Sequence, residues 1–333
     1  MNGDFIWRDA GRTVVFRHNG IAQAPQLLRE HGFEPFELLA GERSLAAAGD
    51  LREGASAVHV VEPGAVSDLA AGLLGAVGEG PLVALGGGRV IDVAKAVAAV
   101  TGAPVAALPT TMSSAEMTGI HRLPAGAEAG VRSLVRPTLV VADPEAMTSQ
   151  PEAALRASSM NALAHGADSL YTPFVNPVSV MAALRGAELI AAALDEPRED
   201  RQPAQLALGS VLCGYAIDSA MFGLHHVVCQ SLVRLCGSPH AETNAAILPR
   251  AAALLAARVP DRMAALATAL STDLEDLEAR LLELGRPAGL GAVGADRARL
   301  DEALDAMLAR PELAFTPDPP DRDELAELVE RAW

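Results

Sequence analysis

Cysteine is scarce in this chain of 333 residues, which contains three of them. Cys213, Cys229 and Cys236 cannot all pair and show no CxxC spacing, so neither a disulfide framework nor a cysteine metal site is expected. A reducing, cytoplasmic compartment is the better expectation. The first residues also lack the basic and then apolar pattern of an export signal, so secretion is not expected.

Long apolar runs and positive charge are also in short supply. The alanine-rich run 181–194 is interrupted by Arg185 and Glu188, and no stretch approaches the roughly 20 apolar residues of a membrane span, so none is predicted. The 42 acidic and 26 basic residues leave a formal net charge of −16. That charge argues against nucleic acid and anionic membrane surfaces as partners.

Lysine is almost absent, because Lys95 is the only one among the 26 basic residues and all the others are arginine. A lysine that survives such a bias is a candidate for a role that arginine cannot fill, such as a compact point charge. Chance is the alternative explanation.

Apolar side chains are abundant, at 50% of the residues against 20% charged. Such a chain buries a sizeable core in one large or two medium domains, and disorder is excluded as its main state. In the first half, short apolar strands alternate with helices, which predicts a parallel α/β sheet covered on both faces. The predicted strands are 13–16, 35–40, 57–61, 81–85, 105–108 and 138–142, and the predicted helices are 21–31, 43–48, 66–77 and 90–100.

The second half is helical in pattern, and turn residues between Asp143 and Pro151 mark a boundary between domains 1–150 and 151–333. The predicted helices are 151–171, 177–194, 204–224, 245–258, 262–270, 273–284, 301–309 and 323–332. The acidic run 273–283 is expected to be a solvated helix face, with a docking surface as the alternative.

A triple glycine, Gly86, Gly87 and Gly88, follows an apolar strand and opens a helix. Glycines let a ligand approach the backbone, and a helix N-terminus offers free N–H groups, so the turn suits a pyrophosphate. Lys95, two turns into the helix, is expected to reach a ribose or phosphate oxygen, and Asp92 lies in the first turn. A plain tight turn is the alternative.

The loop after the next strand carries hydroxyl groups, with Thr110 and Thr111 at its start. It should lie at the same carboxyl edge of the sheet, where ligands bind in open α/β folds. The hydroxyls can donate to phosphate or ribose oxygens, and an ordinary polar loop is the alternative.

Half of the eight histidines gather in the helical half of the chain. Asn161, His165 and Asp168 share one face of a helix, and they are followed in the sequence by the pair His225–His226 and by His240. Such a cluster can bind a metal, carry protons or hold an anionic substrate, although one histidine alone is more often a core residue.

These motifs, in this order, resemble the iron-containing (group III) alcohol dehydrogenase superfamily, and most of all its maleylacetate reductase branch. The resemblance covers essentially the whole chain. It implies the dehydroquinate synthase-like fold, in which an α/β dinucleotide-binding domain at 1–150 precedes an all-α catalytic and substrate domain at 151–333. It also implies a homodimer, an active site in the cleft between domains, and NAD(H) or NADP(H) as cofactor.

The resemblance assigns roles to individual residues. Cofactor binding falls to Gly86, Gly87, Gly88, Thr110 and Thr111, supported by Asp92 and Lys95. The catalytic candidates are Asn161, His165, His225, His226 and Gln230. Apart from the resemblance, His121, Arg122 and His240 are candidates for binding the carboxylates of a substrate, with Arg132 as a further cation.

The chain departs from the family at the metal ligands. Metal-dependent members bind iron or zinc through an aspartate and three histidines, and Asn161, His165, His226 and His240 stand at these positions. Because a neutral amide is a poor ligand for a divalent ion, we expect no catalytic metal. Any metal would depend on the three histidines.

Two further departures concern charge. The branch usually reads HHKxCH, whereas Val227 and Gln230 stand at the lysine and the last histidine, and a glutamine cannot deliver a proton. Arg89 stands where a small polar residue is usual, and either contacts a phosphate or crowds it. The segment 119–136 is also shorter than usual.

The favoured function is an NAD(P)H-dependent reductase that transfers hydride to a carbonyl or enoate of a small carboxylic acid. With maleylacetate as substrate, the product would be 3-oxoadipate. The proton would come from His165, His225, His226 or water. The alternatives are a non-redox lyase, dehydratase or cyclase of secondary metabolism on the same fold, and a metal-dependent alcohol dehydrogenase. The choice between NAD and NADP stays open: near residues 40–43 there is no clear aspartate for a ribose, and Arg43 is the one candidate for contacting the phosphate of NADP.

Overall fold

The computed structural model describes residues 5–9, 11–127, 131 and 134–333. It consists of two units, an α/β unit spanning Met1–Gln150 and a helical unit spanning Pro151–Trp333. Arg132, a predicted substrate contact, lies outside the described residues.

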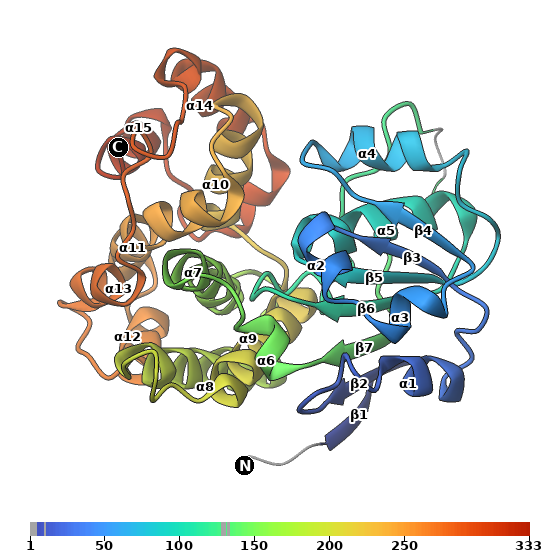
Figure 1. Cartoon of the computed structure of the whole chain (residues 1–333). Helices are drawn as coiled ribbons and strands as arrows, with labels where there is room; N and C mark the ends of the chain where they lie inside the picture. The colour runs from blue at the N-terminus through green and yellow to red at the C-terminus, as the bar shows by residue number, and fades with distance from the viewer. Residues whose placement is uncertain (1–4, 10, 128–130, 132–133) are drawn as a thin grey trace. The chain divides into compact units, whose positions relative to one another are not determined.

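The α/β unit is built on a seven-stranded sheet with the order β1-β2-β7-β6-β5-β3-β4 (Figure 1). Every neighbouring pair is parallel except β1 and β2, so the predicted parallel sheet is confirmed. The sequence pattern missed β1, which forms an antiparallel hairpin with β2. The strands are β1 (Phe5–Asp9), β2 (Arg12–Phe16), β3 (Glu37–Ala40), β4 (Ala57–Val60), β5 (Leu82–Gly86), β6 (Val105–Pro109) and β7 (Leu139–Ala142).

Helices cover both faces of this sheet (Figure 1). Alternate residues of β5 point to opposite faces: Leu82 and Ala84 pack with α4 and α5, whereas Val83 and Leu85 pack with α1 and α3. All residues of β5, β6 and β7 are buried, which explains their continuous apolar sequences. The helices are α1 (Ala24–Glu30), α2 (Glu42–Ala46), α3 (Asp50–Glu53), α4 (Val66–Leu73), α5 (Gly88–Thr101) and α6 (Pro144–Met147).

The helical unit surrounds α7, in which every residue from Leu155 to Asp168 is buried. A helix that is buried on all sides lies at the centre of its domain, and α7 contacts α8, α9, α10, α11 and α13. The helices are α7 (Glu152–Asp168), α8 (Pro177–Asp195), α9 (Pro203–Ala220), α10 (Leu224–Leu235), α11 (His240–Arg258), α12 (Pro260–Ala269), α13 (Leu277–Gly285), α14 (Leu300–Leu308) and α15 (Arg322–Glu330), with 3₁₀ turns η1 (Arg297–Arg299) and η2 (Pro311–Phe315).

Glycines bring α8 and α9 close together. A Cβ on Gly186 would lie 2.8 Å from the carbonyl oxygen of Gly209, and a Cβ on Gly209 would lie 2.9 Å from that of Gly186. Among the described residues α8 is long and apolar enough for a membrane span, as is the bent pair α9–α10 if taken together. However, 56% of the apolar stretch of α8 is buried within the protein, which is typical of a core helix.

The sequence pattern missed α10 and misplaced its neighbours. The helix predicted at 204–224 ends at Ala220, because the backbone at Met221 turns to a φ of 61°. The helix predicted from residue 245 begins at His240 instead. Histidine and β-branched valine have modest helix propensity, so the segment His225–Val228 carries a weak local signal, and packing against α7, α11 and α14 stabilises α10.

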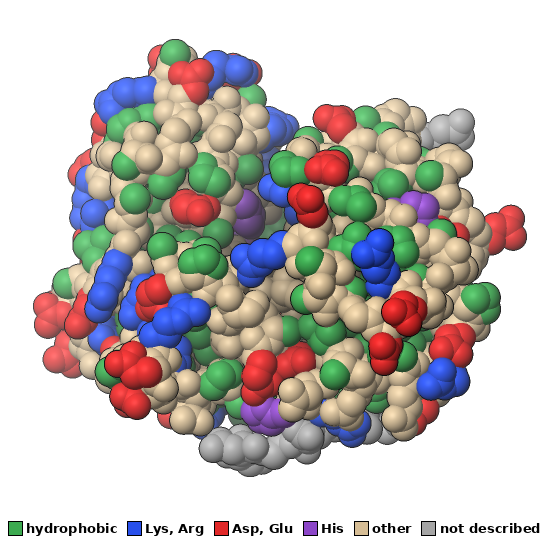
Figure 2. Space-filling view, viewed as in Figure 1, with side chains coloured by type: hydrophobic (Ala, Val, Ile, Leu, Met, Phe, Trp, Pro, Cys, Tyr) green, Lys and Arg blue, Asp and Glu red, His purple; other side chains and the backbone are tan. Residues whose placement is uncertain are grey.

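Acidic side chains of the helical unit are interspersed with arginines on the face shown in Figure 2. In the predicted acidic face, Glu278 pairs with Arg250 and Arg331, and Glu283 pairs with Arg280. Opposite charges therefore compensate part of this acidic run.

Candidate functional site

The glycine turn of the α/β unit packs directly against the threonine loop. A Cβ on Gly87 would lie 2.9 Å from Cγ2 of Thr111, and a Cβ on Gly88 would lie 3.0 Å from Cβ of Ser113. Gly87 is the N-cap of α5 and has no side chain to accept the first N–H groups of the helix. The turn therefore presents backbone donors at the positive end of a helix, beside a loop that larger residues would push away.

The two predicted threonines lie at this turn. Gly86 and Pro109 are paired in the sheet, and the backbone N–H of Thr110 donates to the carbonyl of Gly86 at 3.0 Å. The hydroxyl oxygen of Thr111 is buried and has no hydrogen-bond partner among the residues that the structure describes. An orphaned hydroxyl beside helix N–H groups fits the oxygens of a nucleotide diphosphate. Arg89 is exposed.

Lys95 turns inward from α5 and is completely buried. Its ammonium group donates to Asp92 Oδ1 at 2.8 Å, to the carbonyl of Ala115 at 3.0 Å and to Thr118 Oγ1 at 3.4 Å. Because an ammonium has three donors, none is left for the predicted contact with a ribose or phosphate oxygen. Lys95 and Asp92 instead hold the loop that follows the two threonines.

In the helical unit, Asp168 organises the histidine cluster. Its fully buried carboxylate accepts hydrogen bonds from the Tyr171 hydroxyl and from the backbone N–H groups of Gly223 at 3.2 Å and His226 at 3.2 Å. It thereby caps α10 from a neighbouring helix. Burial alone would raise the pKa of Asp168, but the hydrogen bond and charge of His226 outweigh it, and the pKa is lowered.

His226 is held by the same carboxylate. Its Nδ1 lies 2.8 Å from Asp168 Oδ2, so Nδ1 carries the proton and Nε2 remains as the second ring nitrogen. Nε2 is buried and has no hydrogen-bond partner in the described part of the chain. The ring stacks on His165, with 4.8 Å between centroids and 18° between planes, and lies 5.7 Å from the ring of Phe222.

His225 is placed differently from its neighbour. Its Nε2 lies 2.8 Å from Asn244 Oδ1, and the amide nitrogen of Asn244 donates to the carbonyl of His240 at 2.7 Å, so Nε2 of His225 is the donor. Burial, with a smaller contribution from the charge of His226, lowers the pKa of His225 to about 3. His225 is therefore a neutral imidazole at physiological pH.

Arg310 is a residue that the sequence reasoning missed. Its Nη1 donates to Gln230 Oε1 at 3.1 Å, its guanidinium lies 5.9 Å from the ring of Phe222, and its Nε pairs with Glu312 at 2.8 Å. Gln230 is four residues after His226 and shares its helix face. Arg310 thus brings positive charge to the face of α10 from which the family's lysine and histidine are lost. No motif around Arg310 signals this contact.

The remaining predicted residues lie on several different elements. Asn161 is buried on α7 one turn before His165, and His240 is exposed at the start of α11. His121 and Arg122 follow the threonine loop in the α/β unit, where Nδ1 of His121 lies 3.1 Å from the carbonyl of Arg122. The structure brings His165, His225 and His226 together with Asp168.

One change in the donor set disfavours a divalent metal. The position of the family's aspartate ligand holds the neutral amide of Asn161, which is a poor ligand for such an ion. Within the described ranges, no group of three or more His, Cys, Asp or Glu side chains is placed to hold a metal ion.

Two protein-family models match the chain. The model described as the C-terminal part of the Fe-containing alcohol dehydrogenase family matches residues 156–333, and a model described as iron-containing alcohol dehydrogenase matches residues 15–151. The two matches together cover most of both units.

Similar proteins include characterised enzymes and solved structures. The maleylacetate reductase of Rhizobium sp. (strain MTP-10005) is 32% identical over 99% of this chain and 97% of its own length. The crystal structure of maleylacetate reductase from Agrobacterium tumefaciens gives a TM-score of 0.82 at 27% identity, covering 100% of this chain and 99% of that one. An iron-containing alcohol dehydrogenase from Corynebacterium glutamicum gives a TM-score of 0.83 at 30% identity, covering 96% and 94%.

Proposed function

The chain belongs to the iron-containing alcohol dehydrogenase family of oxidoreductases, and on that premise we propose that it is an NAD(P)H-dependent reductase of a small carboxylic acid. The similar proteins named maleylacetate reductase favour a carbonyl or enoate acid such as maleylacetate as the substrate. Hydride reduction of such a group leaves an oxyanion or enolate, which needs charge stabilisation and a proton.

The geometry of His226 is the observation that carries this proposal. Asp168 holds Nδ1 at 2.8 Å, so the ring has one orientation and its unpartnered Nε2 is the atom that gains or gives a proton. The negative charge of Asp168 stabilises the imidazolium that donates. We propose His226 as the proton donor and Asp168 as its positioning residue. His225, with its pKa lowered to about 3, is neutral and is the weaker candidate.

The α/β unit supplies the features that fit a nicotinamide nucleotide. The N-terminus of α5 at Gly87 and Gly88, together with the hydroxyl of Thr111, would hold the diphosphate. The bound nucleotide would supply the hydride. Arg89, the residue after the triple glycine, is exposed.

The carboxylate of the substrate is proposed to pair with Arg310. Its side chain is 21% exposed, and the contact with Gln230 places it on the His226 face of α10. A guanidinium has five N–H donors and binds a carboxylate through two parallel hydrogen bonds, and in Arg310 Nε donates to Glu312 and Nη1 to Gln230. His121, Arg122 and His240 stay predicted substrate contacts.

The test is the rate of NAD(P)H oxidation with keto and enoate acids, maleylacetate included. We expect His226→Gln to lower kcat roughly 10²- to 10⁴-fold without weakening nucleotide binding, because only proton delivery is lost. His225→Gln, the matched control on the same helix, should lose far less. A His226→Gln variant with the kcat of the parent enzyme would contradict the role of His226, and a parent enzyme inactive with every acid would contradict the function.

A further inference from the structure

A pocket of about 190 Å³ opens at the carboxyl edge of the sheet, in the α/β unit. Its apolar lining includes Ile21 and Leu85. Its polar lining comprises Arg43 and the hydroxyl-bearing residues Ser44, Thr110 and Ser149. Nothing in the proposed chemistry at His226 uses this pocket.

The pocket adjoins the glycine turn. Leu85 is the residue before Gly86, and the N–H of Thr110 donates to the carbonyl of Gly86 at 3.0 Å. Arg43 and Ser44 belong to α2, which follows β3, and β3 is the strand paired with β5. In open parallel sheets a dinucleotide lays its diphosphate on the glycine turn and its adenosine ribose at the end of the neighbouring strand. The pocket therefore lies where the adenosine half belongs.

The charge of the pocket distinguishes the adenosine ribose of NAD(H), which has a free 2′-hydroxyl, from that of NADP(H), which carries a 2′-phosphate. Arg43 is its one charged lining residue, and it has no hydrogen bond or ion pair with any residue that the structure describes. A free ribose hydroxyl is typically bound by an acidic side chain, whereas a 2′-phosphate needs a cation and hydroxyl donors. Among the described residues no carboxylate lines the pocket, so its chemistry matches the phosphate.

Two nearby carboxylates are occupied elsewhere. Asp143 accepts from the N–H groups of Ile21 at 3.0 Å and Glu145 at 3.1 Å. Glu145 pairs with His18 at 2.6 Å. Glu42 is exposed and precedes Arg43 on α2, so this carboxylate is a competitor for a ribose hydroxyl.

We propose that this pocket binds the 2′-phosphate of an adenosine ribose through Arg43 and Ser44, so that the chain prefers NADP(H) to NAD(H). This inference rests on the proposed reductase function and names its cofactor.

The test is equilibrium binding of NADPH and NADH to the full-length chain by nucleotide fluorescence, with 2′,5′-ADP and ADP as fragments in calorimetry. We expect NADPH to bind at least about tenfold more tightly than NADH, because the 2′-phosphate makes charge-assisted hydrogen bonds that a free ribose hydroxyl does not make. Arg43→Gln should weaken NADPH and 2′,5′-ADP about ten- to a hundredfold and leave NADH and ADP unchanged. Arg52→Gln, an exposed arginine of α3 outside the pocket lining, is the matched control.

Each other outcome overturns the inference in a distinct way. Equal binding of NADPH and NADH, unchanged in Arg43→Gln, overturns the phosphate site and leaves the reductase function standing. Preference for NADH that disappears in Glu42→Gln assigns the ribose to Glu42 instead. Absence of binding by either nucleotide overturns the proposed function together with the inference.

Discussion

Glu116 is a buried acid that no motif singled out. Its carboxyl oxygens have no hydrogen-bond partner in the described part of the chain, and it is completely buried near Lys95 and Arg12. Burial raises the pKa of Glu116 from 4.5 to about 7, against the opposing charges of Lys95 and Arg12. The protonated form is therefore favoured on folding.

The consequence is a pH-dependent stability. Because the pKa of Glu116 is higher in the folded state, its contribution is complete below pH 4.5 and is lost as the pH rises through about 7. We expect Glu116→Gln to raise the free energy of unfolding by roughly 3 kcal/mol at pH 8 and by less than about 1 kcal/mol at pH 5. Urea unfolding at both pH values measures this. Glu62→Gln, at an exposed position, is the control, and equal effects at the two pH values would refute the argument.

Single residues also show where sequence reasoning stopped. The rarity of lysine marked Lys95 as special, and the structure shows it buried. What it contacts was not predictable, because the carbonyl of Ala115 lies 20 positions further along the chain. The contact of Arg310 was not predictable either, because it donates a hydrogen bond to Gln230, which lies 80 positions away in the sequence.

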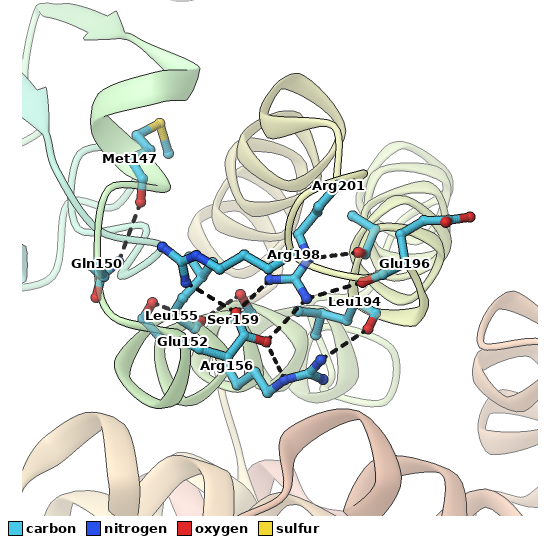
Figure 3. A network of polar contacts seen from close by, with 12 residues as sticks. Met147, Gln150, Glu152, Leu155, Arg156, Ser159, Leu194, Glu196, Arg198 and Arg201 are labelled. Atoms are coloured by element: carbon cyan, nitrogen blue, oxygen red, sulfur yellow. Dashed lines mark hydrogen bonds and ion pairs between the residues drawn. The ribbon is translucent and has the colours of Figure 1, made fainter.

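At the scale of elements, the carboxylate of Glu152 connects the start of one helix to the segment between two others through hydrogen bonds. Glu152, at the start of α7, accepts hydrogen bonds from Arg156 at 2.6 Å, Arg198 at 3.1 Å and Arg201 at 2.9 Å (Figure 3). These hydrogen bonds and charges, led by that of Arg201, lower the pKa of Glu152 to about 2. The cluster joins the beginning of α7 to the segment between α8 and α9.

The arginines of this cluster also cap helix ends. Arg156 donates to the carbonyl of Leu284 at 2.7 Å, near the end of α13, and to that of Leu194 at 3.2 Å, near the end of α8. Arg201 donates to the carbonyl of Ala193 at 2.9 Å. Cations at helix C-termini satisfy carbonyls that have no partner within the helix and oppose the negative end of the dipole.

We expect Glu152→Gln to lower the free energy of unfolding by about 1–2 kcal/mol, because three arginines lose their carboxylate. This free-energy change is set low to allow for solvent screening, since the Glu152 side chain is 37% exposed. With its pKa lowered, Glu152 stabilises the fold above pH 4.5 and loses this effect as the pH falls toward about 2. Thermal unfolding at pH 7 and pH 3 measures both effects. Glu188→Gln breaks an exposed pair with Arg185 and is the control, and losses of equal size in both variants would contradict the role of the cluster.

Elements differed in how well the sequence predicted them. The strands β2, β5, β6 and β7 were found because continuous apolar runs bounded by glycine or proline are a strong local signal. By contrast, α10 was missed, because packing rather than helix propensity determines that segment. Its N-terminus is capped by Asp168 of α7, a contact outside any sequence window.

At the scale of the whole molecule, metal removal is the sharpest test. Because a neutral amide stands at the position of the family's aspartate ligand, we expect dialysis against EDTA to change Tm by less than about 1 °C and to leave activity intact. A metal at 100 times its Kd would add about 2.7 kcal/mol, which corresponds to several degrees in a chain of this size. Iron or zinc near one equivalent, with a Tm that falls on dialysis, would restore the metal-dependent dehydrogenase.

Other whole-molecule expectations stay predictions. The homodimer follows from the family resemblance, and the avoidance of nucleic acid follows from the net charge of −16. The cytoplasmic location follows from the pattern of cysteines. Light scattering tests the homodimer, and a DNA-binding titration at physiological salt tests the avoidance of nucleic acid. Cell fractionation tests the location.

The sequence by itself determined the class of each half of the chain and the order of its motifs, because strand alternation, helical spacing and glycine turns are properties of short windows. The roles of His225 and His226 were decided only by the tertiary structure. These neighbours have the same side chain, yet His226 is hydrogen-bonded to Asp168, 58 positions away, and His225 to Asn244, 19 positions away. Proton chemistry depends on such partners and on burial, and both arise when distant elements pack.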